Sequence, residues 1–116
     1  MEKKAKKIPR QPATARRKDV SAMVEDIVGC KWSLSVLRLV RDGVNRPGAM
    51  QKAVDGLSTK VLNERMRKLQ SFGIVEKHAY PEIPPRVEYQ LTDFGARFSS
   101  LLDGVASLQG WLDAKP

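Results

Sequence analysis

Residues 57–69, LSTKVLNERMRKL, combine side chains that can bind nucleic acid with an apolar stripe that can be buried. Lysine and arginine can neutralise phosphates, and asparagine and arginine can each form paired hydrogen bonds with a base edge. Residues three or four apart share one face of a helix. An ordinary amphipathic helix has the same pattern, so spacing alone leaves both interpretations open. The polar face consists of Lys60, Asn63, Glu64, Arg67 and Ser71, and the apolar stripe of Leu62, Met66 and Leu69.

The start of this helix is predicted at Ser58, whose hydroxyl can accept from a backbone N–H of the first turn. A helix N-terminus favours anions, so Ser58, Thr59 and Lys60 are predicted to bind a phosphate. Asn63 and Arg67 lie further along the exposed face and are predicted to read bases. The first turn would therefore fix the position on DNA, and the later turns would read the sequence.

Three further side chains of this helix have less specific expected roles. Glu64 either accepts from a cytosine amino group or holds Arg67 or Lys68 in place, and the holding role is favoured. Lys68 is expected to contact the DNA backbone. Arg65 lies between the two faces and could form a structural ion pair.

No set of side chains points to catalysis or to a metal site. His78 is the only histidine and Cys30 the only cysteine, whereas structural zinc sites need four ligands. The sequence also lacks a glycine-rich phosphate-binding loop. We therefore expect a protein that is not an enzyme and that has no cofactor.

Cys30 admits two interpretations. It stands at the start of the predicted second helix with Lys31 after it, and both features favour the reactive thiolate of a redox sensor. The alternative is a small buried residue, since buried cysteine behaves as a small hydrophobe. A single cysteine cannot form an internal disulfide, in agreement with a reducing compartment.

Positive charge is concentrated at the N-terminus. The chain has 116 residues and a net charge of +8. Residues 1–20 contain eight Lys and Arg and two acids, so they carry +6 of that charge. With Pro9, Pro12 and no apolar periodicity, residues 1–18 are predicted to be a disordered basic arm. Such an arm either binds nucleic acid by releasing counterions or only keeps the protein soluble.

Length and composition are typical of one globular domain. Hydrophobic residues make up 41% of the chain, and residues 19–116 are predicted to form that domain. No apolar segment is long enough to cross a bilayer, and the basic N-terminus lacks the apolar stretch of a secretory signal. We therefore expect a cytoplasmic protein without a membrane partner.

Apolar periodicity predicts three helices before residue 57. The first follows Asp19, and its short apolar face includes Met23 and Ile27. The second spans residues 31–41 and has little polar surface, so it should be central and buried. The third spans residues 46–54, and a turn at residues 55 and 56 joins it to the Ser58 helix. Two short helices joined this tightly form a helix-turn-helix.

Two strands with a proline-rich connection are predicted after these helices. Residues 74–80 and 86–91 alternate apolar and polar side chains, and prolines in residues 81–85 stiffen the turn. The pair would form a β-hairpin wing with Arg86 near its tip. Arg86 is expected to contact the minor groove or a phosphate, or to be only a solvated arginine flanked by Glu82 and Glu88.

The last predicted helix begins after Thr92, which can cap it, and continues to residue 112. Its apolar residues alternate steps of four and three, the heptad pattern of helices that pack on one another. This helix could pack only on the core of its own chain, but we expect it to form a homodimer. Such a dimer would bind an inverted-repeat operator with half-sites roughly 10 base pairs apart or a little more. The expected interface consists of Phe98, Leu101, Val105 and Leu108, together with Met23 and Ile27 of the first helix.

Three segments together resemble the HxlR-type winged helix-turn-helix transcriptional regulators of bacteria and archaea. They are GCKWSLSVLRLVRDG (29–43), LSTKVLNERMRKLQSFGIVEK (57–77) and YPEIPPRVEYQLTDFG (80–95). The last is the most specific, because helix and strand boundaries match together with the proline-rich tip. The fold expected is mostly α (α+β), a winged helix-turn-helix with a two-stranded wing and a long C-terminal dimerisation helix.

The resemblance implies a homodimer that binds double-stranded DNA and usually acts as a repressor, with the recognition helix in the major groove. A small-molecule effector, if there is one, would bind in the apolar space between the dimerisation helices and the helix-turn-helix. The alternative is a winged-helix module that binds protein or RNA. The cationic helix face and the basic arm favour DNA.

The sequence departs from the family pattern in three places. Cys30 stands where members usually have a second glycine, and residues 19–21 lack the cysteine that some members use as a thiol sensor. Arg46, Pro47 and Gly48 replace the usual Arg-Phe-Ser or Arg-Phe-Thr. Because proline lacks the donor that a short first strand would use, we do not expect that strand. Because residues 19–21 lack the sensing cysteine, we do not expect thiol sensing by the usual route either.

Overall fold

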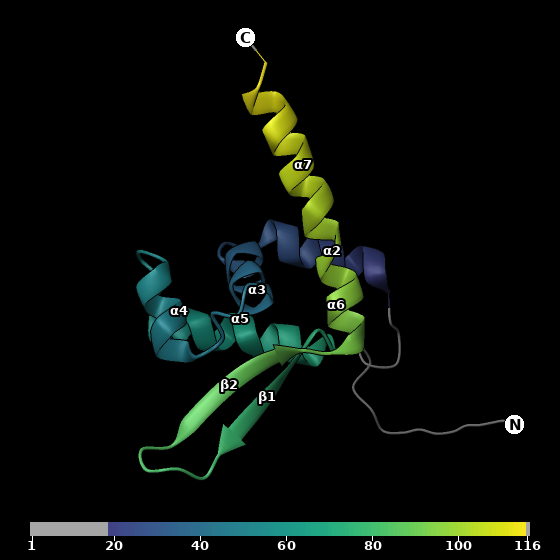
Figure 1. The fold of residues 1–116 in the computed structure, drawn as a ribbon. Coiled ribbons are helices and arrows are strands. Elements are labelled where there is room, and N and C mark those ends of the chain that lie inside the picture. The colour runs from purple at the N-terminus through teal and green to yellow at the C-terminus, as the bar shows by residue number, and fades with distance from the viewer. Residues whose placement is uncertain (1–18, 116) are drawn as a thin grey trace, which may run out of the picture.

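The computed structural model describes residues 19–115 and shows a mostly helical chain with one β-hairpin (Figure 1). The predicted arm, residues 1–18, lies outside the described residues. Prediction and structure agree on the order and type of the elements through the wing. The elements are α2 (Val20–Gly29), α3 (Ser33–Arg41), α4 (Pro47–Ala53), α5 (Thr59–Ser71), β1 (Val75–Tyr80), β2 (Arg86–Leu91), α6 (Asp93–Ser99) and α7 (Leu101–Asp113).

The central helix α3 begins at Ser33, two residues later than periodicity predicted. Trp32 has a φ of 77°, a left-handed conformation through which a right-handed helix of L-residues does not continue. The prediction that this helix is buried is confirmed, because Val36 and Leu37 have no exposed surface.

Helices α4 and α5 form the predicted helix-turn-helix. Gly56 makes the turn with a φ of 86°, which glycine adopts without the steric cost of a Cβ. Leu57 is buried directly after the turn and fixes the start of α5 against the core. The apolar stripe of α5 is buried as predicted, and it consists of Leu62, Met66 and Leu69.

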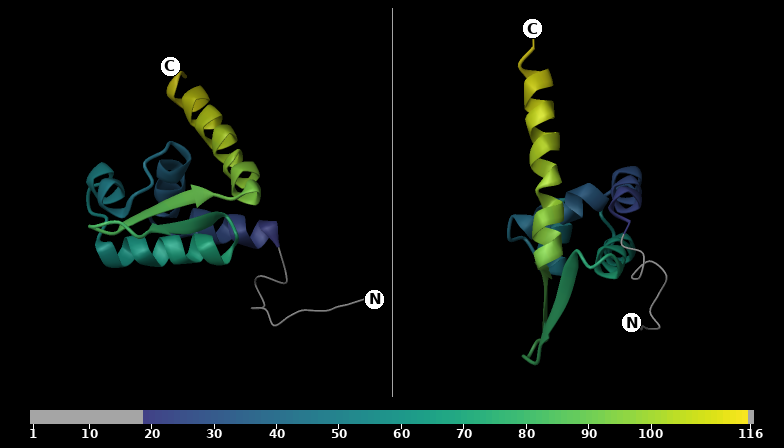
Figure 2. Two further views of the ribbon diagram at one scale, coloured as in Figure 1. Left: turned by 60° about the horizontal axis from the view of Figure 1, so that its bottom comes forward. Right: turned by 90° about the vertical axis from the view of Figure 1, so that its right-hand side faces the viewer.

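Strands β1 and β2 form the predicted wing. They pair antiparallel from Val75 opposite Leu91 to Tyr80 opposite Arg86, and the hairpin projects from the helices (Figure 2). Over residues 19–115 the sheet has these two strands alone, as expected from Pro47. The segment before α4 makes only one strand-like hydrogen bond to the wing, from Tyr89 N–H to the Asn45 carbonyl at 2.9 Å.

The hydrophobic core lies between α2, α3, α5 and the inner face of the hairpin. Helix α5 and the wing are therefore two sides of one packed unit, and their relative position is fixed by the core. Residues from all these elements contribute, among them Met23, Ile27, Val36, Leu37, Met50, Leu62, Met66, Leu69, Ile74, Val75 and Tyr89.

The long C-terminal helix is divided at Ser100, which differs from the single helix that the heptad predicted. Thr92 caps α6 as expected, since its hydroxyl accepts from the Gly95 N–H at 2.8 Å. At the division, the Ser99 hydroxyl donates to the Ala96 carbonyl and the Ser100 hydroxyl to a carbonyl three residues back. Such bonds compete with the helical pattern and bend helices. From Ser100, α7 extends away from the body (Figures 1 and 2).

Candidate nucleic-acid interface

Two side-chain contacts fix the N-terminus of α5. The Ser58 hydroxyl accepts from the Val61 N–H at 3.1 Å, so the predicted N-cap is confirmed. Gln51 of α4 donates to the Thr59 hydroxyl at 3.0 Å and to the Leu57 carbonyl at 3.4 Å. Gln51 therefore ties α4 to the first turn of α5. Periodicity could not indicate this role, because both partners lie across the turn.

The polar face of α5 points away from the core. Lys60, Asn63 and Arg67 are all exposed, whereas Met66 of the same helix is fully buried. Within residues 19–115 no ion pair engages Lys60 or Arg67. Both cations can therefore bind an anion without first losing a partner from the described part of the protein. An exposed helix N-terminus beside Lys60 adds its own preference for phosphate.

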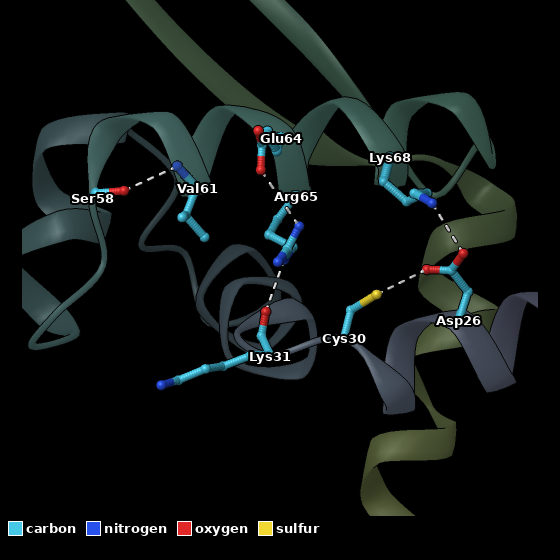
Figure 3. A network of polar contacts seen from close by, with 8 residues as sticks. All are labelled: Asp26, Cys30, Lys31, Ser58, Val61, Glu64, Arg65 and Lys68. Carbon is cyan, nitrogen blue, oxygen red and sulfur yellow. Dashed lines mark hydrogen bonds and ion pairs between the residues drawn. The ribbon is translucent and has the colours of Figure 1, made fainter.

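The other charged residues of α5 are engaged within the protein (Figure 3). Lys68 Nζ lies 3.0 Å from Asp26 Oδ2 of α2. Arg65 Nε donates to the Lys31 carbonyl at 2.8 Å, and the Glu64 carboxylate lies 3.9 Å from the Arg65 guanidinium. Asp26, rather than Glu64, therefore holds Lys68. A phosphate contact by Lys68 would have to compete with Asp26, although a solvent-exposed pair of this kind is worth only about 0–1 kcal/mol.

Cys30 lies at the C-terminal end of α2, and α3 begins three residues later. The expected helix N-terminus around the thiol is therefore wrong, because the end of α2 carries the opposite partial charge. The thiol donates to Asp26 Oδ1 at 3.4 Å, and the same carboxylate binds Lys68 (Figure 3). The half-buried thiol thus lies beside a carboxylate, and not at a helix N-terminus as expected.

Arg86 is paired within the wing. Its guanidinium lies 2.9 Å from Glu82 and 3.3 Å from Glu88. It also stacks on the Tyr80 ring, with 4.1 Å between the guanidinium carbon and the ring centre. The two carboxylates that flank Arg86 in the sequence thus neutralise it in space. A contact between Arg86 and DNA would have to displace at least one of them.

Arg46 is a second cation beside the wing, and periodicity did not single it out. It lies 3.3 Å from the same Glu88 oxygen that binds Arg86. Its side chain is 53% exposed, against 29% for Arg86. The cleft between α4 and the wing, about 420 Å³ in volume, is lined by both arginines and by Glu82. Glu88 therefore links the wing to the helix-turn-helix, and Arg46 is the more accessible of the two cations.

Tyr89 shows how closely the exposed face of α5 adjoins the wing. Burial raises the pKa of Tyr89 above its usual value of 10.0, and the positive charge of Arg67 partly opposes that rise. The phenol therefore stays protonated at neutral pH. Arg67 of α5 therefore lies close enough to the buried Tyr89 of β2 to act on its phenol.

The residues expected at a dimer interface separate into two groups. Met23, Ile27 and Phe98 belong to the core of the single chain, with exposed fractions of 3%, 1% and 7%. They cannot form an outer surface, so they can only support one from beneath. The other three expected residues are exposed and lie on α7, namely Leu101 (49%), Val105 (46%) and Leu108 (67%). Trp111 (59%) and Leu112 (57%) of the same helix are exposed as well.

A small apolar cavity lies where an effector was expected, between α2, α3 and the last two helices. Its volume is about 60 Å³. Small-molecule sites usually measure roughly 300–1,000 Å³, so the cavity of one chain is too small for a typical ligand. An effector stays a prediction. The lining residues are Val24, Ile27, Val28, Leu34, Phe98, Leu101, Leu102 and Val105.

Residues 19–115 show neither of two structural features that would point to other functions. No three His, Cys, Asp or Glu residues of that part lie together as a metal site would require. No helix in the same range has the length and apolar character needed to cross a membrane.

The chain was compared with known protein families and with curated proteins. The family model described as HxlR-like helix-turn-helix matches residues 27–115. An uncharacterised HTH-type transcriptional regulator of Synechocystis is 43% identical over 91 residues, which cover 78% of this chain and 67% of the relative. The HTH-type transcriptional regulator YtfH of Escherichia coli is 33% identical over 86 residues, which cover 74% and 66%. The matched part thus spans about two thirds of the length of these relatives.

Solved structures show the same fold. A regulator from Enterococcus faecalis, described as a member of the MarR family, superposes with a TM-score of 0.66 at 30% identity. The superposition covers 90% of this chain and 92% of the other. Its description as a transcriptional regulator agrees with those of the curated relatives.

Proposed function

The chain belongs to the HxlR-like helix-turn-helix family, and from this premise we propose that it is a sequence-specific DNA-binding regulator of transcription. We further propose that it acts in the cytoplasm as a homodimeric repressor and binds an inverted-repeat operator. Helix α5 would enter the major groove, and the wing would lie beside it.

The observation that carries the proposal is the exposed face of α5. It presents Lys60 at the helix N-terminus and Asn63 and Arg67 further along, with their side chains in solvent. Asn63 and Arg67 are the residue types that bind adenine and guanine edges with paired hydrogen bonds. Ser58 and Thr59 would add phosphate contacts at the first turn. Lys68 and Arg86 would contribute less, because carboxylates of the protein already bind them.

The proposed dimer rests on α7. Beyond Leu102 every described residue of this helix is exposed, and its apolar side chains form one stripe. A helix of 13 residues with such a stripe is stabilised when the stripe is covered. A second copy offers the same stripe, and a two-fold axis would bring the two together. The dimer would present two α5 helices to successive turns of DNA, and an operator that overlaps a promoter would then be closed to polymerase.

Two substitutions on α5 separate base reading from phosphate binding. If Arg67 reads a guanine, Arg67→Ala should cost about 1–3 kcal/mol on the operator and much less on random DNA. If Lys60 binds a phosphate, Lys60→Ala should weaken both complexes about equally and reduce the salt dependence by roughly one unit. Titrations of operator and random duplexes at two or more salt concentrations measure both effects.

A matched control is Lys115→Ala, which removes an equal charge just beyond the end of α7. It should leave the ratio of operator to random-DNA affinity unchanged. An unchanged ratio for Arg67→Ala as well would refute base reading by Arg67. DNA shape, Asn63 or Thr59 would then carry the specificity.

The dimer is tested separately by light scattering. The expected mass is twice the 13.0 kDa of one chain, and Leu108→Asp should shift it toward one chain by placing a charge in the stripe. A wild-type mass of one chain at micromolar concentration would refute the dimer. The second candidate function, a winged-helix module that binds protein or RNA, would be favoured by binding to duplex RNA as tight as to any DNA sequence.

A further inference from the structure

The position of α7 depends on a contact that the apolar pattern does not show. The apolar core ends near Leu102, which is 4% exposed, and the rest of α7 is exposed. One buried side chain can hold the base of a helix without fixing its direction. Any contact that fixes this direction must therefore lie close to the division at Ser100.

Arg41, at the end of α3, makes such a contact. Its guanidinium donates through one nitrogen to the Ser99 carbonyl at 3.2 Å, and the other nitrogen binds the Asp103 carboxylate. Ser99 is the last residue of α6, and Asp103 lies in the first turn of α7. One arginine of the central helix therefore binds both sides of the division. We call these two contacts the Arg41 clamp.

The Ser99 carbonyl is available because the division changes the hydrogen bonds of the helix. The Asp103 N–H donates to the Ser100 carbonyl at 3.0 Å, three residues back instead of four. An unbroken α-helix would use the Ser99 carbonyl there. Ser99 is 3% exposed, and a buried carbonyl without a donor is costly. Arg41 supplies the missing donor, so the bend at Ser100 and the clamp stabilise each other.

We infer that Arg41 is a positioning residue that sets the direction of α7, and through it the spacing between the two half-sites that the dimer selects. This inference rests on the proposed function, because it needs α7 to join two copies. The length of α7 shows how strongly the position of its far end depends on the angle at its base. Thirteen helical residues span about 20 Å, so a change of roughly 10° at the base moves the far end by about 3.5 Å. That is close to one base-pair step of about 3.4 Å.

The first test measures the direction of α7 within one chain. Spin labels are attached through Ala53→Cys on α4 and Ala106→Cys on α7, both exposed, in a protein that also carries Cys30→Ser. Labelled chains are diluted with an excess of unlabelled protein, and the distance distribution is recorded by double electron–electron resonance. We expect one narrow distribution, a broader or shifted one with Arg41→Ala, and an intermediate one with Arg41→Lys, which keeps the charge but not the fork.

Arg38→Ala is the matched control, since it removes an exposed arginine from the same helix outside the clamp. It should leave the distance distribution unchanged. Asp103→Ala should broaden it less than Arg41→Ala does, because Arg41 keeps its bond to the Ser99 carbonyl. Adding Asp103→Ala to Arg41→Ala should change little, because the contact between the two residues is already lost. An unfolding transition that stays cooperative in each variant shows that the chain still folds. An unchanged distribution with Arg41→Ala overturns the inference.

The second test selects operators from a library in which the distance between half-sites varies. The wild type should prefer one spacing, and Arg41→Ala should reduce the affinity ratio between that spacing and its neighbours by about threefold, as loss of a partly exposed ion pair can do. Affinity for an isolated half-site should not change. The same sharp preference in both proteins overturns the role in spacing. The two tests can also give different results. If the wild type selects no paired half-sites, the proposed dimeric function fails. If the distance distribution between the spin labels still broadens in Arg41→Ala, the role of the clamp in setting the direction of α7 is supported all the same.

Discussion

Gly95 is predicted to be the glycine at which a single methyl group is most damaging. It lies in α6, directly against the backbone of Ile74 at the base of the wing. A Cβ built on Gly95 would lie 2.8 Å from the Ile74 carbonyl carbon and 3.2 Å from its Cα, and it would overlap the carbonyl oxygen. Ordinary carbon contacts are about 3.5–4.0 Å, so the backbone of one element would have to move by more than roughly half an ångström.

The cost of that movement can be estimated from what the Ile74 carbonyl does. It accepts the Thr92 N–H at 3.1 Å, in the cap that joins β2 to α6. Over-packing a core usually costs about 1–3 kcal/mol. A strained buried hydrogen bond adds on the order of 1 kcal/mol. We therefore expect Gly95→Ala to lower the free energy of unfolding by roughly 3 kcal/mol, a large part of the stability of a small domain.

The assay is urea unfolding at one fixed protein concentration, followed by circular dichroism. Gly48→Ala is the control, because Gly48 lies in α4 with nothing within 4 Å of its built Cβ. That change should stabilise the protein by about 0.5–1 kcal/mol, as Gly to Ala does in an open helical site. If Gly95→Ala stays within about 1 kcal/mol of the wild type, then the base of the wing adapts more freely than the close approach implies.

Two further predictions follow from the contacts of single side chains. Arg86→Ala should change the salt dependence of DNA binding by clearly less than the roughly one unit expected of a phosphate contact, because Glu82 and Glu88 already neutralise it; a full unit in the titration would show that DNA displaces the carboxylates. Tyr89→Phe should remove a loss of stability that the wild type shows at high pH. The raised pKa of Tyr89 stabilises the folded state fully below pH 10.0, and this contribution is lost as the pH rises through the folded-state pKa. The prediction would be contradicted if the difference in unfolding midpoint between the wild type and Tyr89→Phe stayed the same at every pH from 8 to 12.

The recognition helix illustrates what can be predicted from local pattern. Ser58 at the N-cap and Leu62, Met66 and Leu69 on the buried stripe were all indicated by residue type and spacing, because helix period and capping act over a few residues. The same spacing placed Lys60, Asn63 and Arg67 on the opposite face, where the structure has them. Their proposed contacts with DNA are still predictions, since no bound DNA tests them.

The partners of the charged residues were not predictable in this way. Lys68 binds Asp26 across two helices, and Arg46 and Arg86 share one oxygen of Glu88 between α4 and the wing. The Lys68–Asp26 and Arg46–Glu88 pairs each join residues 42 positions apart, and sequence spacing carries no information about such an approach. Arg86 differs, because Glu82 and Glu88 flank it in the sequence. Cys30 was expected at the N-terminus of the second helix, but it lies at the C-terminal end of α2. The left-handed conformation of Trp32 delays the start of α3 to Ser33, and apolar periodicity does not indicate such a conformation.

The sequence by itself determined the elements and their exposed and buried faces, since backbone propensity and apolar periodicity depend only on near neighbours. Tertiary structure decided which charges remain available and where the C-terminal helix points. Whether a cation can bind DNA depends on the carboxylate that packing brings to it, as Asp26 is brought to Lys68. The heptad predicted one straight helix after Thr92, but Arg41 from a distant helix binds both sides of Ser100 and holds the bend. Periodicity reports a face of a helix, whereas a direction in space is set by contacts between elements.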